Sequence, residues 1–203
     1  MKCKIAIFGG TFNPVHNGHI HLAMRFANLL GVEKVLLIPT KTPPHKIAVD
    51  LVSSEDRLAM CRLVSKNSIF EVSDIEVRRA GPSYTADTLK QLKLIYPDSE
   101  FYFITGEDMF LTIQSWYEPK VIYSLATLCA APRSRDGLEN LKRHAAILER
   151  YGAKTVIGNI DYLPISSTMV RDAVKQGKSI TELVPAAVAD YIMENNLYLE
   201  SVQ

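Results

Sequence analysis

Gly9-Gly10-Thr11-Phe12-Asn13-Pro14-Val15-His16-Asn17-Gly18-His19 is the most informative segment of this sequence. It follows an apolar run at residues 4–8, KIAIF, which has the length and composition of a buried strand. It leads into residues 20–30, where apolar side chains recur at the spacing of one helix face: Ile20, Ala23, Met24, Ala27 and Leu30. The order of strand, glycine turn and helix predicts the first unit of a parallel α/β fold, with a ligand site at the turn.

The glycines and histidines of this stretch indicate a phosphate site. Gly9 and Gly10 let backbone N–H groups approach a ligand closely, and a helix N-terminus adds partial positive charge. His16 and His19, three residues apart, fall on one face and can point at one phosphate. The pair also has a metal-like spacing, but no acidic or cysteine third ligand is near in the sequence, so we expect no zinc site. His21 is expected to be a packing or surface residue.

Composition bounds the class of protein. The 203 residues are 47% hydrophobic and 22% charged, as in an ordinary globular protein, and we expect a single domain over residues 1–203. A formal net charge of +1 argues against a broad basic surface, so no nucleic-acid partner is expected.

The three cysteines and the hydropathy pattern favour a cytoplasmic protein. Cys3, Cys61 and Cys129 show no metal-ligand spacing and are expected to be reduced thiols. No signal-peptide pattern is found, and no apolar run approaches the roughly 18 to 20 residues of a membrane span.

Strand-like and helix-like segments alternate along the chain. Strands are expected at residues 4–8, 34–39, 70–77, 100–105, 127–131 and 155–158. Helices are expected at residues 20–30, from 53 or 54 to 66, and at 85–96, 139–151, 167–176 and 186–195. The alternation predicts an α/β fold: a Rossmann-like doubly wound parallel sheet flanked by helices, with a small C-terminal helical subregion at about residues 165–203.

A second polar motif, ISSTMVR at residues 165–171, opens one of these helices. Hydroxyl groups at a helix start can cap the helix or bind phosphate, and Arg171, one turn further on, can reach the same anion. The alternative is a plain cap beside a solvated arginine.

Taken together, HNGH at residues 16–19 and SSTMVR at 166–171 resemble the HxGH and SSTxxR signatures of the nucleotidyltransferase superfamily. Within it, the chain is similar to the bacterial nicotinate-nucleotide adenylyltransferases over nearly its whole length. The segments that carry this closer resemblance are PPHK at 43–46, PSYTADTL at 82–89, GEDMF at 106–110 and SWY at 115–117. Two positions depart from the usual pattern: Asn13 replaces an aspartate, and Glu107 replaces a small residue beside the expected ATP site.

The resemblance implies transfer of AMP from ATP to nicotinate mononucleotide, which gives deamido-NAD and pyrophosphate. It implies four catalytic residues: His16, His19, Lys46 and Arg171. The ATP site would comprise Gly9, Gly10, Thr11, Phe12, His16, Gly18, His19, Gly106, Asp108, Ser167, Thr168 and Arg171. The nicotinate-mononucleotide site would comprise Asn13, His45, Lys46, Tyr84, Thr85, Trp116 and Tyr117. Mg²⁺ would be carried by the ATP phosphates and water, with no metal ligand from the protein.

The physical chemistry of the second-substrate segments agrees with this implication. Trp116 is the only tryptophan, and its flat indole can stack on a pyridine ring. Thr85 opens a helix, so its hydroxyl and nearby backbone N–H groups could hold a carboxylate. The alternatives are a rim tryptophan that packs on a helix and a plain helix cap. Lys46, on the stiff Pro43-Pro44 loop, is expected to close over the triphosphate.

Other functions stay open at this stage. A same-class rival uses nicotinamide mononucleotide, alone or with the acid, and a second is a pantetheine-phosphate adenylyltransferase. A rival from another class is a non-catalytic nucleotide sensor. The sequence leaves the oligomeric state undecided, with a homo-oligomer open.

Overall fold

The computed structural model describes residues 3–42, 50–65 and 68–199. The predictions for His45 and Lys46 therefore lie outside the described residues. Six parallel strands form one sheet in the order β3-β2-β1-β4-β5-β6. Their bounds are β1 Lys4–Gly10, β2 Lys34–Pro39, β3 Phe70–Val72, β4 Glu100–Thr105, β5 Ala126–Ala130 and β6 Lys154–Ile157. This is the strand order of a Rossmann-like doubly wound sheet, so the predicted fold class is confirmed.

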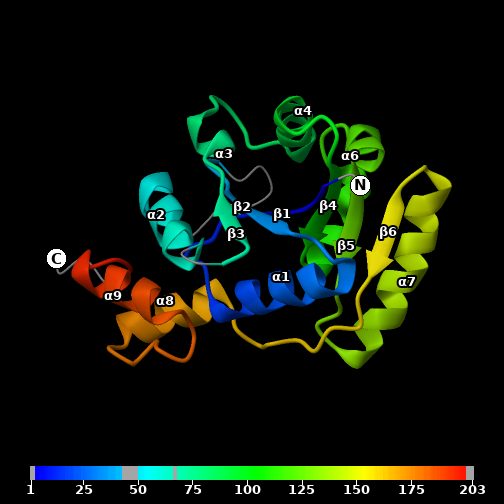
Figure 1. The fold of residues 1–203 in the computed structure, drawn as a ribbon. Helices are drawn as coiled ribbons and strands as arrows, with labels where there is room; N and C mark the ends of the chain where they lie inside the picture. Colours follow the sequence, from blue (N-terminus) through cyan, green and yellow to red (C-terminus); the bar gives the residue numbers. More distant parts are fainter. Residues whose placement is uncertain (1–2, 43–49, 66–67, 200–203) are drawn as a thin grey trace.

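Helices cover both faces of the sheet (Figure 1). On one face lie α1 Asn17–Leu30, α2 Ser54–Ser65, α8 Ser167–Lys175 and α9 Ala186–Glu194. Against the other face lie α4 Thr85–Ile95, α5 Glu107–Phe110, the 3₁₀ turn η1 Ile113–Ser115, α6 Pro119–Leu125 and α7 Arg135–Arg150. The short α3 Ile75–Arg78 follows β3. The alternating side chains of β1 explain the two layers, because Ala6 and Phe8 face one core while Ile5 and Ile7 face the other.

The chain direction places the site between two strands. β1 leads outward to β2 and β3, whereas β4 leads to β5 and β6 on the opposite side. The connections after β1 and β4 therefore diverge, and parallel sheets open a ligand crevice at such a point. Gly9 and Gly10 end β1 at this edge, and Gly106 follows β4.

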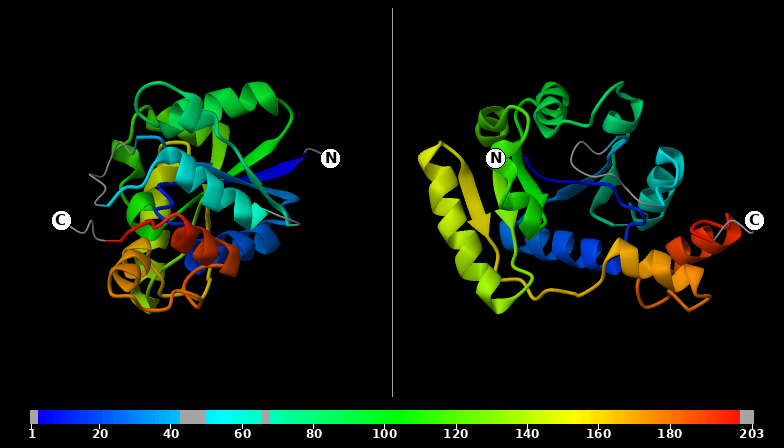
Figure 2. Two further views of the ribbon diagram at one scale, coloured as in Figure 1. Left: turned by 90° about the vertical axis from the view of Figure 1, so that its left-hand side faces the viewer. Right: turned by 180° about the vertical axis from the view of Figure 1, so that it is seen from behind.

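The C-terminal segment returns to the start of α1. From β6 the chain runs beneath α1 to α8 and α9, as both Figure 1 and the right-hand view of Figure 2 show. Asn17 donates its backbone N–H to Leu183 O at 2.9 Å and its side-chain amide to Glu182 O at 3.0 Å. These hydrogen bonds join the HNGH turn to a segment more than 160 residues later in the sequence.

Some predicted boundaries are wrong, for local reasons. The expected strand at 70–77 ends at Val72, because Ser73 and Asp74 make a turn that starts α3. The helices expected from residues 20 and 139 begin at Asn17 and Arg135, since the side chains of His16 and Ser134 cap them. Elements α5, η1 and α6 were not expected.

Candidate active site

A cavity of about 650 Å³ opens at the divergence between β1 and β4. Every predicted site residue within the described ranges lines it. These are Gly9, Gly10, Thr11, Phe12, Asn13, His16, Gly18, His19, Tyr84, Thr85, Gly106, Asp108, Trp116, Tyr117, Ser167, Thr168 and Arg171. His21 also lines the cavity, and its ring Nε2 lies 2.9 Å from Asp161 O.

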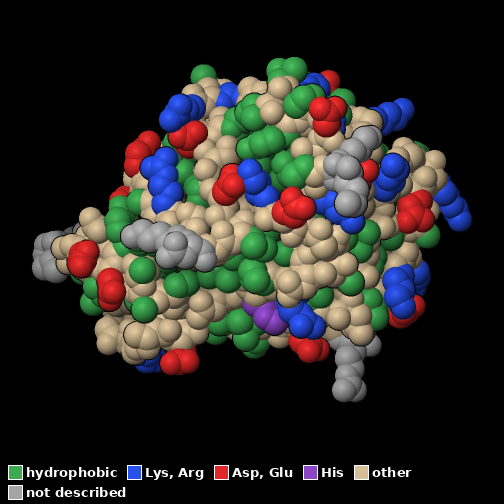
Figure 3. All heavy atoms as spheres, in the orientation of Figure 1, with side chains coloured by type: hydrophobic (Ala, Val, Ile, Leu, Met, Phe, Trp, Pro, Cys, Tyr) green, Lys and Arg blue, Asp and Glu red, His purple; other side chains and the backbone are tan. Residues whose placement is uncertain are grey.

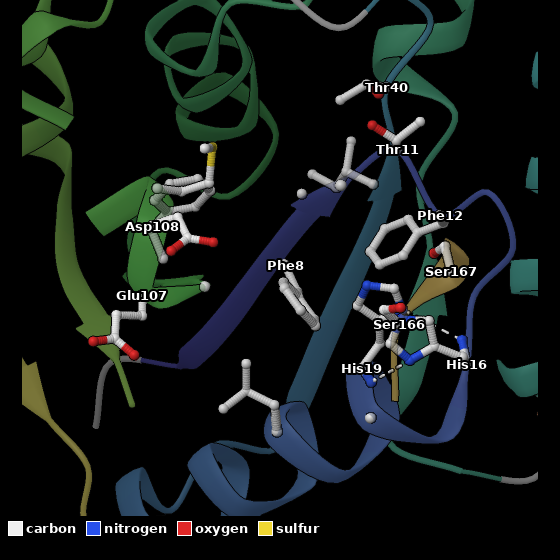
Figure 4. Close-up of a pocket in the computed structure, with 18 of the residues that line it drawn as sticks. Phe8, Thr11, Phe12, His16, His19, Thr40, Glu107, Asp108, Ser166 and Ser167 are labelled. Atoms are coloured by element: carbon white, nitrogen blue, oxygen red, sulfur yellow. Dashed lines mark hydrogen bonds between the residues drawn. The ribbon is translucent and has the colours of Figure 1, made fainter. Parts of the chain in front are cut away.

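His16 and His19 form a reciprocal cap at the start of α1 (Figure 4). The His19 N–H donates to His16 Nδ1, and the His16 N–H donates to His19 Nδ1, each at 3.3 Å. Since each Nδ1 is an acceptor, the proton of each neutral imidazole sits on Nε2. The cap therefore turns both rings into N–H donors beside the cavity.

Burial keeps this pair neutral. It lowers the pKa of His16 to about 4. It also lowers the pKa of His19 well below 6.5, with smaller contributions from His16 and Arg133 in the same direction. The two rings stack with centroids 3.6 Å apart, and Phe12 packs edge-on against His19. At neutral pH the site thus presents two uncharged donors.

Gly18 packs closely against this pair, with little room for a side chain. A Cβ at position 18 would lie 3.1 Å from the His16 ring and 3.2 Å from Ile165 O. A side chain there would require the His16 ring or the segment before α8 to shift by a few tenths of an ångström. The glycine of the HNGH motif thus lets the histidine turn and the second motif approach each other.

The second motif brings the N-terminus of α8 to the histidines. Ser166 caps α8 by accepting the Met169 N–H at 3.2 Å, whereas the Ser167 hydroxyl donates to Pro14 O at 2.9 Å. Arg171 donates to Asn13 O at 2.9 Å and to the Thr168 hydroxyl at 3.3 Å. Ser167 and Arg171 thus hold the turn after β1, and the predicted phosphate contacts of these residues stay a prediction.

Asn13 lines the cavity and is held by hydrogen bonds within the protein, and its predicted contact with nicotinate mononucleotide stays a prediction. Its amide group donates to Asp50 O at 2.9 Å, and its side-chain oxygen accepts from the Tyr198 hydroxyl at 3.0 Å and the Val52 N–H at 3.3 Å. Arg171 donates a hydrogen bond to the backbone oxygen of Asn13. An aspartate at this position could not donate to Asp50 O, so the departure from the family pattern changes a structural bond.

Glu107 and Asp108 lie across the cavity from the histidines (Figure 4). Glu107 accepts the Arg133 N–H at 2.7 Å, and a Cβ on Gly137 would lie 2.5 Å from its carboxylate. Its charge therefore lies against the start of α7, where a helix N-terminus stabilises it. Asp108 forms an ion pair with Arg133 at 2.7 Å.

Aromatic rings line the other end of the cavity. Trp116 is half-buried, with its ring edge-on to Phe103 at 6.3 Å between centroids. Tyr84 and Tyr117 stack on each other at 4.4 Å. Thr85 is the first residue of α4, and the preceding Tyr84 makes no side-chain cap. An uncapped helix start beside a tryptophan suits a planar ring that carries an anionic group.

A buried network supports the start of α4. The Thr88 hydroxyl donates to Glu76 Oε1 at 2.6 Å, and Arg79 donates to Thr88 Oγ1 at 3.0 Å and Tyr84 O at 3.4 Å. Burial raises the pKa of Glu76. The sequence analysis did not predict this network, although Glu76 and Arg79 lie close in sequence to the PSYT segment and could have suggested part of it. It also did not predict the contacts of Arg133 with Asp108 or of the buried Arg57 with Thr11 and Thr40.

The described helices include none long and apolar enough to cross a membrane. Within the described ranges, no three His, Cys, Asp or Glu side chains gather as a metal-binding group. On the face drawn in Figure 3, Lys and Arg side chains are interspersed with Asp and Glu.

Comparison with known proteins assigns the class. The sequence pattern of the cytidylyltransferase-like family matches residues 7–173, so the chain belongs to that family.

Its relatives narrow the assignment. One from Desulfitobacterium hafniense is 43% identical over 200 residues, covering 96% of this chain and 95% of its own. One from Dehalococcoides mccartyi is 41% identical over 200 residues, covering 98% of both. Both carry the name "Probable nicotinate-nucleotide adenylyltransferase". The branch of the family to which this chain belongs is therefore that of the nicotinate-nucleotide adenylyltransferases.

Solved structures agree on the fold. The nicotinic acid mononucleotide adenylyltransferase of Plasmodium falciparum, in complex with NaAD, superposes with a TM-score of 0.78 at 24% identity over 97% of both chains. Its complex with APC gives 0.76 at 23% identity.

Proposed function

We propose that this protein is a cytoplasmic nicotinate-nucleotide adenylyltransferase, which transfers AMP from ATP to nicotinate mononucleotide and releases pyrophosphate. One observation carries the proposal: a single cavity has imidazole donors and two helix N-termini at one end and an aromatic, uncapped helix start at the other. The first end suits a triphosphate and the second a pyridine carboxylate. The names of the relatives at about 40% identity agree with it.

The reaction needs positioning more than a base. The 5′-phosphate of nicotinate mononucleotide has a second pKa near 6, so it is already largely ionised at neutral pH. One of its oxygens forms a bond to the α-phosphorus of ATP, and the bond from that phosphorus to the bridging oxygen of pyrophosphate breaks. In this assignment, His16 and His19 donate from Nε2 to the α- and β-phosphates, and His19 stabilises the transition state.

The leaving group requires positive charge. Arg171, the α8 N-terminus and Lys46 would hold the triphosphate and the departing pyrophosphate. Arg171 already lies in the cavity wall, where its bonds to Asn13 O and the Thr168 hydroxyl orient the guanidinium. An incoming phosphate offers stronger, charge-assisted bonds than these neutral acceptors do.

Mg²⁺ is proposed to enter with ATP. A cation bound mainly by phosphate and water oxygens needs few protein ligands. The donors nearest the phosphate end are N–H groups, which suit phosphate oxygens rather than a metal. Bound there, Mg²⁺ would neutralise triphosphate charge.

The acid is favoured over the amide at the pyridine end. The α4 N-terminus offers backbone N–H donors and partial positive charge, which stabilise a carboxylate more than a neutral carboxamide. The Thr85 hydroxyl can donate to either group.

A paired substrate comparison tests the proposal. Pyrophosphate release is measured with ATP and Mg²⁺ and either mononucleotide at matched concentrations, with pantetheine phosphate as a third acceptor. We expect the highest kcat/KM with nicotinate mononucleotide. Release with none of them, together with ATP binding, would identify a nucleotide sensor, and a preference for the amide would reverse the assignment at the pyridine end.

A further inference from the structure

Arg57 is a buried cation in the first turn of α2, and it is not among the residues that line the cavity. Only 1% of its surface is exposed. Every hydrogen bond that its guanidinium makes to the described residues goes to a backbone carbonyl oxygen. A buried arginine usually has a carboxylate partner, so this arrangement needs a reason.

The location is costly for a positive charge. Burial lowers the pKa of Arg57, yet a guanidinium stays protonated in proteins. The residue also sits near the positive end of the α2 dipole. Burial and the helix dipole oppose the charge, and the described acceptors of its hydrogen bonds are carbonyl dipoles, with the nearby Glu55 carboxylate giving smaller support.

The guanidinium joins three segments around the cavity. Its NH1 group donates to Thr11 O at 2.8 Å and to Thr40 O at 2.6 Å. Weaker contacts run from NH2 to Lys41 O at 3.4 Å and from Nε to Val52 O at 3.3 Å. Thr11 and Thr40 both line the cavity and lie beside each other in Figure 4. One side chain thus ties together the ends of β1 and β2 and the start of α2.

These bonds fix which way two peptide groups face. In a trans peptide the N–H points opposite to the C=O. With Thr11 O turned to Arg57, the N–H of Phe12 must point away from Arg57. With Thr40 O turned to Arg57, the Lys41 N–H also points away, and it donates to the Ser83 hydroxyl at 3.1 Å. Ser83 directly precedes Tyr84 and Thr85 at the pyridine end of the cavity.

We infer that Arg57 is a positioning residue for adenylyl transfer: it holds the Thr11–Phe12 and Thr40–Lys41 peptides so that the phosphate and pyridine ends of the cavity keep their relative placement. It acts through these peptides and touches no substrate. The inference rests on the proposed function and adds a residue to which that function assigns no role.

Arg57→Lys is the first test, with Arg62→Lys as the matched control. Both arginines lie on α2, but Arg62 is exposed and only approaches Asp74 at 3.7 Å. Lysine keeps the charge and loses the planar fork that reaches several carbonyls at once. Below the melting temperature of each protein, we expect kcat/KM to fall about 10 to 100-fold for Arg57→Lys, the scale of a small misplacement of reacting groups. Arg62→Lys should stay within about twofold.

Chemical rescue separates positioning from stability. Arg57→Ala is assayed with ethylguanidinium at constant ionic strength, with tetramethylammonium as the control cation. We expect ethylguanidinium to restore activity several-fold in Arg57→Ala and to leave the wild type and Arg62→Ala unchanged. If Arg57→Ala does not fold, the lysine variant decides.

Two results would overturn the inference. One is a kcat/KM of Arg57→Lys within about twofold of the wild-type value. The other is an Arg57→Ala enzyme that folds, is not rescued by ethylguanidinium, and loses activity only in proportion to the fraction of molecules that are unfolded. The proposed function is judged separately, from the wild type alone. If the wild type binds ATP but uses no acceptor, the ATP dissociation constant replaces kcat/KM, and an unchanged constant in Arg57→Lys refutes the inference.

Discussion

Acidification should destabilise this protein through its buried histidine pair. In the native state the pKa of His16 is about 4, whereas an unfolded histidine has a value near 6.5. Between these values the unfolded chain binds a proton that the native protein does not. Stability is therefore fully present above pH 6.5 and is lost as the pH falls toward 4.

The loss in unfolding free energy depends on how far the pH lies below the pKa of histidine in the unfolded chain. A pH of 5 lies about 1.5 units below the pKa of histidine in the unfolded chain, and each unit corresponds to about 1.36 kcal/mol of unfolding free energy. His16 alone should thus remove about 2 kcal/mol from the free energy of unfolding. His19 acts in the same direction, because its pKa is lowered as well.

Urea denaturation at pH 7 and pH 5 measures this loss in the wild type, in His16→Asn and in His21→Asn. Asparagine is a good helix cap that does not titrate, so His16→Asn keeps the start of α1 while removing the proton site. The wild type and His21→Asn should lose about 2 kcal/mol more than His16→Asn between the two pH values. Equal losses in all three proteins would refute the account of a buried, neutral His16.

Four further predictions concern the site directly. His19→Ala should lower kcat by at least about 100-fold without unfolding the protein, as expected for one lost transition-state donor, and a variant that keeps most of its kcat would remove His19 from the mechanism. Trp116→Ala should raise KM for nicotinate mononucleotide several-fold and far more than KM for ATP, since stacking is worth about 0.5 to 1.5 kcal/mol; equal effects would make Trp116 structural. Gly18→Ala should reduce kcat about 10-fold or more through displacement of the His16 ring, measured by pyrophosphate release, and a crystal structure with an unmoved ring would contradict this cause. Lys46→Met should cut kcat/KM for ATP about 10 to 100-fold, as expected for one lost charge-assisted contact of about 1.5 to 3 kcal/mol, and unchanged ATP kinetics would leave its loop without a role.

The sequence predicts the sheet and the cavity well because their signals are local. The strands at Lys34–Pro39 and Glu100–Thr105 contain the apolar runs VLLI and FYFI, which are typical of parallel strands covered on both faces. The glycine turn and the two histidines lie within eleven consecutive residues, so a strand before them and a helix after them are enough to bring them into one site.

The remaining features depend on partners distant in the sequence. Nothing near Arg57 indicates that its side chain collects carbonyl oxygens from Thr11 and Thr40, which lie 46 and 17 residues away. The direction of the Glu107 carboxylate likewise depends on Gly137 and on the backbone of Arg133. Periodicity and composition hold no information about such contacts.

The fastening of Asn17 by Glu182 and Leu183, and of Asn13 by Tyr198, has a consequence for protein synthesis. The ribosome makes the histidine turn well before residues 182–198, which secure it. A nascent chain can assemble strands and helices as they emerge, but Asn17 gains its bonds only after Leu183 has been made, and Asn13 gains its bond to Tyr198 only after α9 has been made. A chain cut short before residue 182 would therefore keep all six strands of the sheet but lack these three bonds at the histidine turn.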